Sequence, residues 1–162
     1  AQTALMAHED PYQAWPELKN VMEAVQKQFP DVTMDNIGFG STIFAVKPGD
    51  GSAREQAASC QKVLGGWANI ATEYATKRYR SNLINWGMLP FVIAKGELPF
   101  KNKDYVFVPG IRAAVKTKAA SIPAYAVSGA AVKKFDLALG DLTDHEREII
   151  LDGCLINYNK MQ

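Results

Sequence analysis

Residues 43–55 of this 162-residue chain read IFAVKPGDGSARE. The first four residues form a short apolar run that is typical of a buried strand, and a glycine-rich turn leads from it into a helix-forming segment. In such a turn the first N–H groups of the helix have no partner within the helix, and the helix dipole favours a bound anion. The stretch therefore predicts a strand, an anion-binding loop over Gly49–Glu55, and a helix.

Two side chains of this loop can contribute chemistry. Arg54, at the start of the expected helix, carries a planar fork of donors that matches a carboxylate. The hydroxyl of Ser52 can hydrogen-bond an anion, or it can accept a proton as an alkoxide that backbone donors and a nearby cation stabilise. The alternative is structural, with Ser52 as a helix N-cap and Arg54 as a surface residue. The loop alone leaves both interpretations open.

The segments around this loop predict parallel strands joined by helices. Hydrophobic spacing and glycine or proline stops indicate helices over Pro16–Phe29, Ala53–Leu64 and Glu73–Trp86, with Gly65-Gly66 and Gly87 as stops. Apolar runs indicate three strands: one that ends at Val46, one over Trp67–Ala71 and one over Leu89–Ala94. Strands that alternate with helices in this way imply parallel pairing with helical crossovers.

The second half of the chain has a different pattern. Short strands are expected at Tyr105–Val108, Ala113–Lys116 and Ile122–Ser128, in a more antiparallel region. Thr143 and Glu146 have capping-box spacing, and the helix that they start continues by its apolar spacing to Tyr158. We therefore expect an α/β fold, a single domain with a partly parallel sheet, helical crossovers and a C-terminal helix.

Composition is ordinary for a soluble globular domain, with 48% hydrophobic and 22% charged residues. The net charge of +1 gives no bulk electrostatic reason to expect nucleic acid or an anionic membrane as partner. No apolar run is long enough to span a bilayer, and no secretory signal is visible. Cys60 and Cys154 stand apart from each other and from other ligand residues, which favours two buried free thiols in a reducing, cytoplasmic compartment.

Several linked motifs resemble the aconitase superfamily. The heptapeptide Gly51-Ser52-Ala53-Arg54-Glu55-Gln56-Ala57 is similar to the signature Gly-Ser-Ser-Arg-Glu-His-Ala. The segments Leu64-Gly65-Gly66, Ser81-Asn82-Leu83 and Gly87-Met88-Leu89-Pro90 resemble, in the same order, the family's Leu-Gly-Gly, Thr-Asn-Leu and Gly-Leu-Leu-Pro. The resemblance is strongest over residues 43–91. It implies that residues 1–162 form the swivelling β/β/α domain of this superfamily, as a fragment of a larger chain.

The resemblance also implies a reaction, the reversible dehydration and hydration of a hydroxy-polycarboxylate such as a tricarboxylic acid. By position, Ser52 would be the catalytic base, Arg54 would bind a substrate carboxylate, and Gly51 and Ala53 would lie beside the substrate. The family's [4Fe-4S] cluster belongs to other domains, on the same chain or on a large subunit, so none is expected to be bound by this chain. The isolated chain is then expected to be inactive.

Three departures from the family pattern keep alternatives open. Ala53 replaces the second serine of the signature, Gln56 replaces its histidine, and no arginine precedes Arg54 in this sequence. One alternative is a stand-alone small subunit of an isopropylmalate-type isomerase. Another is a non-catalytic module that keeps the fold for RNA or protein contacts. For the basic segment Lys77–Arg80 we favour a solvated helix face, or a face turned to the larger domains, over an RNA site.

Overall fold

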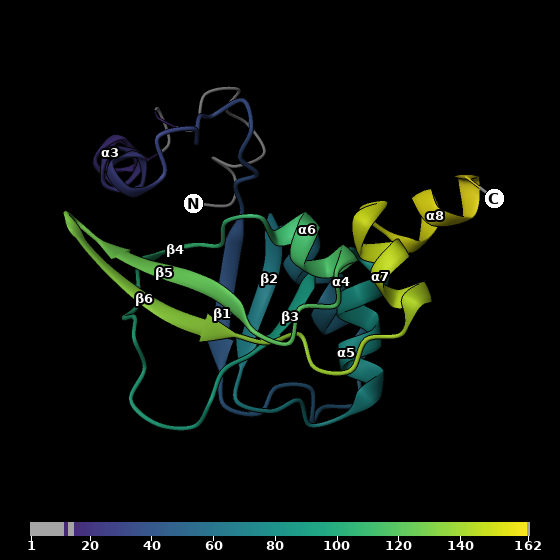
Figure 1. Cartoon of the computed structure of the whole chain (residues 1–162). Coiled ribbons are helices and arrows are strands. Elements are labelled where there is room, and N and C mark those ends of the chain that lie inside the picture. The colour runs from purple at the N-terminus through teal and green to yellow at the C-terminus, as the bar shows by residue number, and fades with distance from the viewer. Residues whose placement is uncertain (1–11, 13–14, 162) are drawn as a thin grey trace.

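Two three-stranded β-sheets and a layer of helices make up the computed structural model, which describes residue 12 and residues 15–161 (Figure 1). The first sheet has the order β1-β2-β3 and contains β1 (Ser41–Ala45), β2 (Gly66–Ala71) and β3 (Leu89–Val92). The second has the order β4-β5-β6 and contains β4 (Tyr105–Phe107), β5 (Ile122–Ser128) and β6 (Ala131–Leu137). This is the α/β architecture expected from the sequence.

The first sheet is parallel throughout, as the alternation of strands and helices predicts. The crossover helices are α4 (Arg54–Val63), between β1 and β2, and α5 (Lys77–Asn85), between β2 and β3. Both crossovers step from one strand to its neighbour in the same direction, so right-handed connections bring both helices to one face of the sheet. The two helices pack against each other, and α7 (Asp144–Leu151) packs against α5 on the same side.

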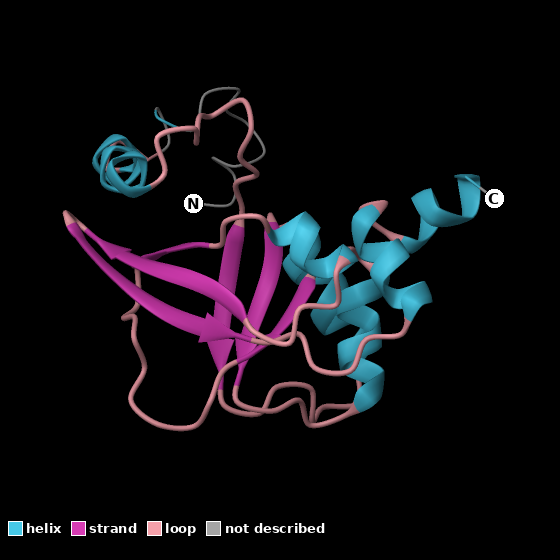
Figure 2. Cartoon of the chain, in the orientation of Figure 1, coloured by secondary structure: helices cyan, strands magenta, loops and turns pink. Residues whose placement is uncertain are grey.

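The second sheet covers the opposite face of the first, and the β5–β6 hairpin crosses in front of β1–β3 (Figures 1 and 2). An antiparallel bridge between Val92, the last residue of β3, and Ala138, directly after β6, joins the sheets. The main hydrophobic core draws on both sheets and on the helices, with buried residues Ile70, Ile84, Phe91, Ile93, Val115, Ile122, Ala124, Leu137, Leu139, Leu142 and Ile149. The resulting order of layers is β/β/α.

A second, smaller core forms under α3 (Leu18–Gln28). The buried face of α3 packs on β5 and β6, and Val127 of β5 belongs to this cluster. The expected helix over Pro16–Phe29 is thus confirmed, with its start two residues later. The start of α7 is also confirmed, because Thr143 and Glu146 form the expected capping box.

The structure corrects three expected elements. The helix expected to start at Glu73 starts at Lys77, because Thr76 caps it and residues 73 and 75 donate backbone hydrogen bonds to another loop. The segment Ala113–Lys116 is not a strand but part of α6 (Ile111–Lys116), which begins directly after the left-handed Gly110. The C-terminal helix is interrupted after α7, because Gly153 has φ +91°, and the chain continues as α8 (Leu155–Met161).

Three further expectations differ from the structure. Strand β6 was not predicted from the sequence. Strand β1 is an edge strand rather than a buried one, and Ile43 is 41% exposed. Cys60 is exposed on α4 rather than buried, while Cys154 is partly buried, and both thiols are free. Across the described residues, none of the helices has the length and apolar character that crossing a membrane requires.

Replacement of Gly87 by alanine tests the packing of the C-terminal segment on α5. Gly87 has φ +70°, and an added Cβ would overlap the carbonyl oxygen of Gly153. We expect Gly87→Ala to lower the free energy of unfolding by about 2–4 kcal/mol, measured by urea denaturation. The matched control is Gly129→Ala, where φ is +60° but no atom lies within 4 Å of the added Cβ, and where we expect a loss of about 1 kcal/mol. Equal losses would contradict the packing argument.

Candidate functional site

The predicted site residues lie at the carboxyl edge of the parallel sheet, the lower edge in Figure 1. The loop after β1 carries Ser52 and leads into α4, and the loop after β2 leads into α5. Ligands of open parallel sheets bind outside the carboxyl ends of the strands, where such loops meet. The sheet topology therefore places Gly51–Arg54 at the carboxyl edge of the parallel sheet, beside the loop between β2 and α5.

The first half of the β1–α4 loop is fastened to the β2–α5 loop by hydrogen bonds. The carbonyl of Val46 accepts from the backbone N–H of Glu73 at 3.2 Å and from the hydroxyl of Thr72. The carbonyl of Pro48 accepts from the N–H of Ala75 at 2.9 Å. These bonds account for the late start of α5, because residues 72–75 pair with the neighbouring loop instead of entering the helix.

Gly49 lies against the aromatic ring of Tyr79. It has φ +94°, and an added Cβ would lie 2.5 Å from the Cβ and ring carbons of Tyr79. Tyr79, in the first turn of α5, is 2% exposed. The position therefore requires glycine for two independent reasons, its left-handed backbone and its contact with the ring.

Arg54 is the first residue of α4 and turns back over its own loop. Its Nε donates to the carbonyl oxygen of Gly51 at 2.8 Å. Among residues 12 and 15–161, its two terminal amino groups have neither a hydrogen-bond acceptor nor an ion-pair partner. The guanidinium is thus fixed at one end, and its other end can bind a carboxylate with two parallel hydrogen bonds.

Ser52 is not the N-cap of α4. The N-cap is Ala53, which has no side-chain acceptor, so no side chain caps the first N–H groups of the helix. Ser52 is exposed, and its hydroxyl has no hydrogen-bond partner within the described part of the chain. Gly51 is exposed as well, with no atom within 4 Å of where its Cβ would be. Gly51–Ala53 therefore form an open turn with free backbone donors nearby, and the structural explanation of Ser52 as a cap is wrong.

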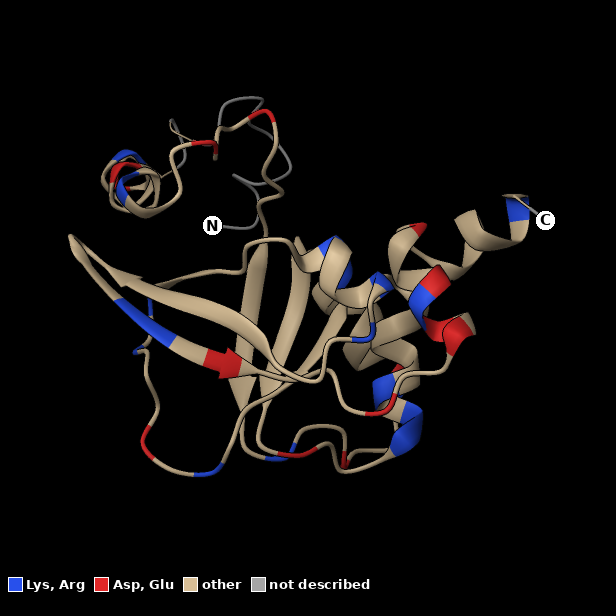
Figure 3. Ribbon diagram, viewed as in Figure 1, with Lys and Arg blue, Asp and Glu red and all other residues tan. Residues whose placement is uncertain are grey.

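Charged residues of both signs lie along the same edge, as the blue and red segments of the lower loops in Figure 3 show. Lys47 Nζ lies 2.8 Å from Glu73 Oε1. The hydrogen bond and charge of Lys47 lower the pKa of Glu73, with a smaller contribution from Lys95, and Glu73 in turn raises the pKa of Lys47. Both groups of this exposed pair are therefore charged at neutral pH, and Arg54 remains the cation of the loop that has no carboxylate partner.

Beneath the loop lies a buried polar network that sequence reasoning missed. The hydroxyl of Tyr79 lies 2.9 Å from the amide nitrogens of both Asn69 and Gln61, which donate to it. The hydroxyl of Tyr74 donates to the carbonyl of Phe91 at 2.9 Å, and burial raises the pKa of Tyr74. The sequence signal was Asn69 itself, a polar residue within an apolar strand, 1% exposed in the structure.

The basic segment Lys77–Arg80 does not form one basic surface. Lys77 and Arg78 are exposed, but Tyr79 is buried. Arg80 directs its Nη2 into the fold, where it donates to the carbonyls of Leu139 and Asp141, both at 2.9 Å. Half of the segment is thus engaged in holding the structure together.

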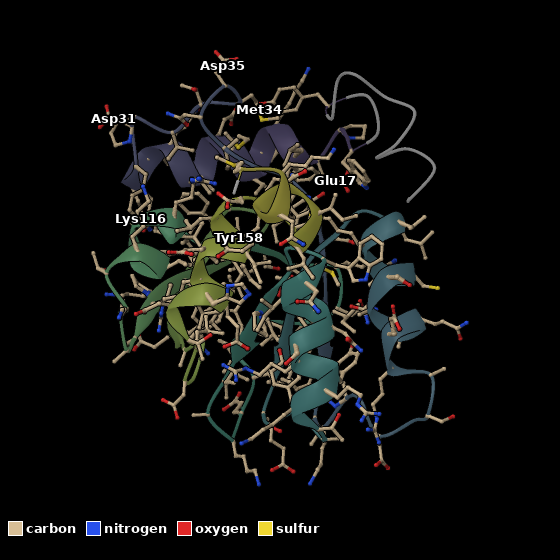
Figure 4. All side chains as sticks on the ribbon, turned by 90° about the vertical axis from the view of Figure 1, so that its right-hand side faces the viewer. Glu17, Asp31, Met34, Asp35, Lys116 and Tyr158 are labelled. Carbon is tan, nitrogen blue, oxygen red and sulfur yellow. The ribbon has the colours of Figure 1, made fainter. Side chains whose placement is uncertain are left out.

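A cavity of about 400 Å³ lies between α6, α7 and α8, at the other end of the domain from the Ser52 loop. Lys116 and Tyr158, which belong to its lining, are labelled in Figure 4. The lining combines Arg112 and Lys116 with Glu148 and Asp152, so its charges balance. Such a lining offers no preference for an anionic substrate, and we place the candidate site at the sheet edge on chemical grounds.

The residues present do not fit an iron–sulfur cluster. Such a cluster requires several thiolates at one place. Among the described residues, no three His, Cys, Asp or Glu side chains are grouped as metal ligands, and the two cysteines lie on α4 and directly before α8. The site is therefore one of backbone donors, a hydroxyl and a guanidinium.

The absence of a capping role for Ser52 can be tested by stability. We expect Ser52→Ala to change the free energy of unfolding by less than about 0.5 kcal/mol, because an exposed hydroxyl without a partner is removed. Thr143→Ala removes the hydroxyl of a residue that does cap a helix, and we expect it to lower the free energy of unfolding by about 1 kcal/mol. Urea denaturation of both variants gives the comparison, and an equal cost at both positions would restore the capping interpretation.

Comparison with known proteins shows the family of this chain. A family model described as the aconitase C-terminal domain matches residues 10–96, just over half of the chain, including the whole parallel sheet and the Ser52 loop. Aconitate hydratase A of Rickettsia bellii (strain RML369-C) is 26% identical over 147 residues, which are 88% of this chain and 16% of that protein. The chain thus spans a small part of that relative's length. By the family match, this chain belongs to the aconitase C-terminal domain family.

Proposed function

We propose that this chain is the substrate-binding and base-supplying domain of an aconitase-like hydro-lyase, which reversibly dehydrates a hydroxy-polycarboxylate. One observation carries the proposal: the exposed hydroxyl of Ser52 shares a turn with Arg54, which is anchored through Nε to Gly51 and has both terminal amino groups available. The family and the relative named aconitate hydratase A support the reaction class.

Ser52 would move the proton of this reaction. Dehydration removes a proton from the carbon next to a carboxylate and a hydroxide from the neighbouring carbon. Ser52 Oγ, as an alkoxide, would accept that proton and would return it in the hydration direction. A serine is a weak base in water, so the alkoxide requires stabilisation. The uncapped N–H groups at the start of α4, the helix dipole and the guanidinium of Arg54 are the groups that supply it.

Arg54 would hold the substrate while the proton moves. Its terminal amino groups can bind one carboxylate through two parallel hydrogen bonds, which fix orientation as well as position. Gly51 leaves room for the substrate close to the loop backbone. Ala53 offers a methyl group where the family signature has a hydroxyl, so we infer one hydrogen bond fewer to the substrate and a substrate preference that differs from that of aconitases with Ser-Ser.

The remaining chemistry is assigned to other domains. Because the described residues do not fit a metal cluster, we assign to this chain only proton transfer and the binding of a substrate carboxylate. The partner would be the cluster-bearing part of the enzyme, on the same polypeptide or on a large subunit.

Substitution of Ser52 and Arg54 in the complete enzyme, reconstituted with its cluster-bearing domains, tests the proposal. The assay follows the absorbance of cis-aconitate and related unsaturated acids. We expect Ser52→Ala to lower kcat about 10²–10⁴-fold with little change in KM, because only the proton acceptor is lost. Arg54→Lys is expected to lower kcat/KM about 10²-fold, mainly through KM, because lysine cannot bind a carboxylate with a planar fork.

The matched control is Ser59→Ala on the same helix, whose hydroxyl donates to the carbonyl of Gln56 at 3.2 Å and which should leave kcat unchanged. Equal turnover by wild type and Ser52→Ala would exclude Ser52 as the base. Conversion of isopropylmalate-type acids without any conversion of tricarboxylates would favour an isomerase small subunit. If the wild-type enzyme converts none of these acids, the chain is better described as a binding module.

A further inference from the structure

We propose that Tyr79 is a positioning residue that sets the spacing of Ser52 and Arg54, so this inference rests on the proposed function. Tyr79 lies on α5, outside the loop that carries the two proposed active residues. It contacts the segment before Ser52 through its ring, and it contacts the helix after Ser52 through its hydroxyl. One buried side chain thus holds both flanks of the turn.

The contact before Ser52 is made at Gly49. The loop backbone lies so close to the Tyr79 ring that a Cβ on Gly49 would be 2.5 Å from it. Thr76 adds a polar connection, since its hydroxyl accepts from the N–H of Tyr79 at 3.2 Å and donates to the carbonyl of Gly49 at 3.3 Å. The position of Gly49, three residues before Ser52, is therefore set by the first turn of α5.

The contact after Ser52 is made through Gln61. Gln61 lies on α4, two turns after Arg54, and its side-chain amide donates to the Tyr79 hydroxyl at 2.9 Å. An α-helix is stiff over two turns, so holding Gln61 also restrains the end of α4 that carries Arg54. The same hydroxyl accepts a hydrogen bond from Asn69 of β2. Through Tyr79, the position of α4 is therefore fixed relative to the parallel sheet.

Tyr79 can fix the positions of its neighbours because its own side chain is buried and tightly packed. Its neighbour Tyr74, with ring centroids 6.3 Å apart, donates through its hydroxyl to the carbonyls of Asn69 and Phe91 on β2 and β3. Leu83 and Met88, both fully buried, pack in the same cluster as Tyr79. By contrast, the turn Gly51–Ala53 is exposed, and its described hydrogen bonds come only from α4, from Arg54 to Gly51 and from the N–H of Ala57 to the carbonyl of Ala53. Its geometry therefore depends on its two flanks.

Tyr79→Phe in the complete enzyme tests this role, because it keeps the ring on Gly49 and removes only the hydroxyl that holds α4. We expect kcat to fall about tenfold or more, since small displacements of a catalytic group are costly. In the Ser52→Ala background the same change should lower kcat by a much smaller factor, because the part of its effect that acts through the position of Ser52 is already lost. Hydrogen exchange of residues 57–64, whose N–H groups are bonded within α4 and at its C-terminal end, should rise, while that of α7 stays unchanged.

Tyr125→Phe is the matched control: this tyrosine of β5 contacts Phe29 and Phe107 by its ring, and no hydrogen bond of its hydroxyl is found in the described residues. It should alter neither kcat nor the hydrogen exchange of residues 57–64. If Tyr79→Phe does not fold, Gln61→Leu removes the bond from α4 at a half-buried position and should give the same local increase in exchange and a fall in kcat.

Two results would overturn the inference. The first is that Tyr79→Phe keeps the wild-type kcat while Ser52→Ala is inactive. This result would refute the role of Tyr79 and leave the proposed function intact. The other is an increase in exchange that extends evenly to α7, which would reduce Tyr79 to a general stabilising residue. If instead Ser52→Ala retains full activity, the proposed function fails, and the exchange of residues 57–64 still decides whether Tyr79 holds α4.

Discussion

The contact between the backbone of Gly49 and the ring of Tyr79 is the constraint on which the candidate site depends. It can form only if β1 and β2 are parallel neighbours, because only then do the loops before α4 and α5 leave the sheet at the same edge. It also requires α5 to start late, at Lys77, so that residues 72–76 can bond to the β1–α4 loop. The order of strands, the helix start and the exposed turn are thus parts of one arrangement.

The two sheets contribute differently to this arrangement. The parallel sheet with its crossover helices carries the loop chemistry, whereas the β4-β5-β6 sheet supplies a hydrophobic cover for the opposite face. Because Asn69 of β2 is buried, its amide nitrogen bonds to the Tyr79 hydroxyl inside the fold, while its Oδ1 has no hydrogen-bond partner among the described residues. The rigidity beneath the loop is therefore a consequence of the β/β/α layering.

Most of the parallel half of the fold could be predicted from the sequence, because strand, turn and helix signals there lie close together in the chain. In the second half, strands β4 and β5 and the capping box of α7 were predicted, but short segments such as Ile111–Lys116 are ambiguous alone and β6 is defined by its pairing with β5. At the site, Ser52 and Arg54 were identifiable from their motif, and their roles remain proposals. The role of Tyr79 could not be predicted, because it lies between basic residues that indicate an exposed helix face. Its hydrogen-bond partners are 10 and 18 residues away in the chain.

The contact between Gly87 and Gly153 bears on how this domain can be divided. The stretch that matches the family model ends at residue 96, yet Gly87 packs on a backbone segment 66 residues further along, and β3 is bridged to Ala138. Cut at the end of the matched stretch, the chain would expose the edge of β3 and the underside of α5 to water. The structural surroundings of the parallel sheet therefore extend beyond the stretch that the family model matches, and truncation at residue 96 would remove contacts that this sheet makes.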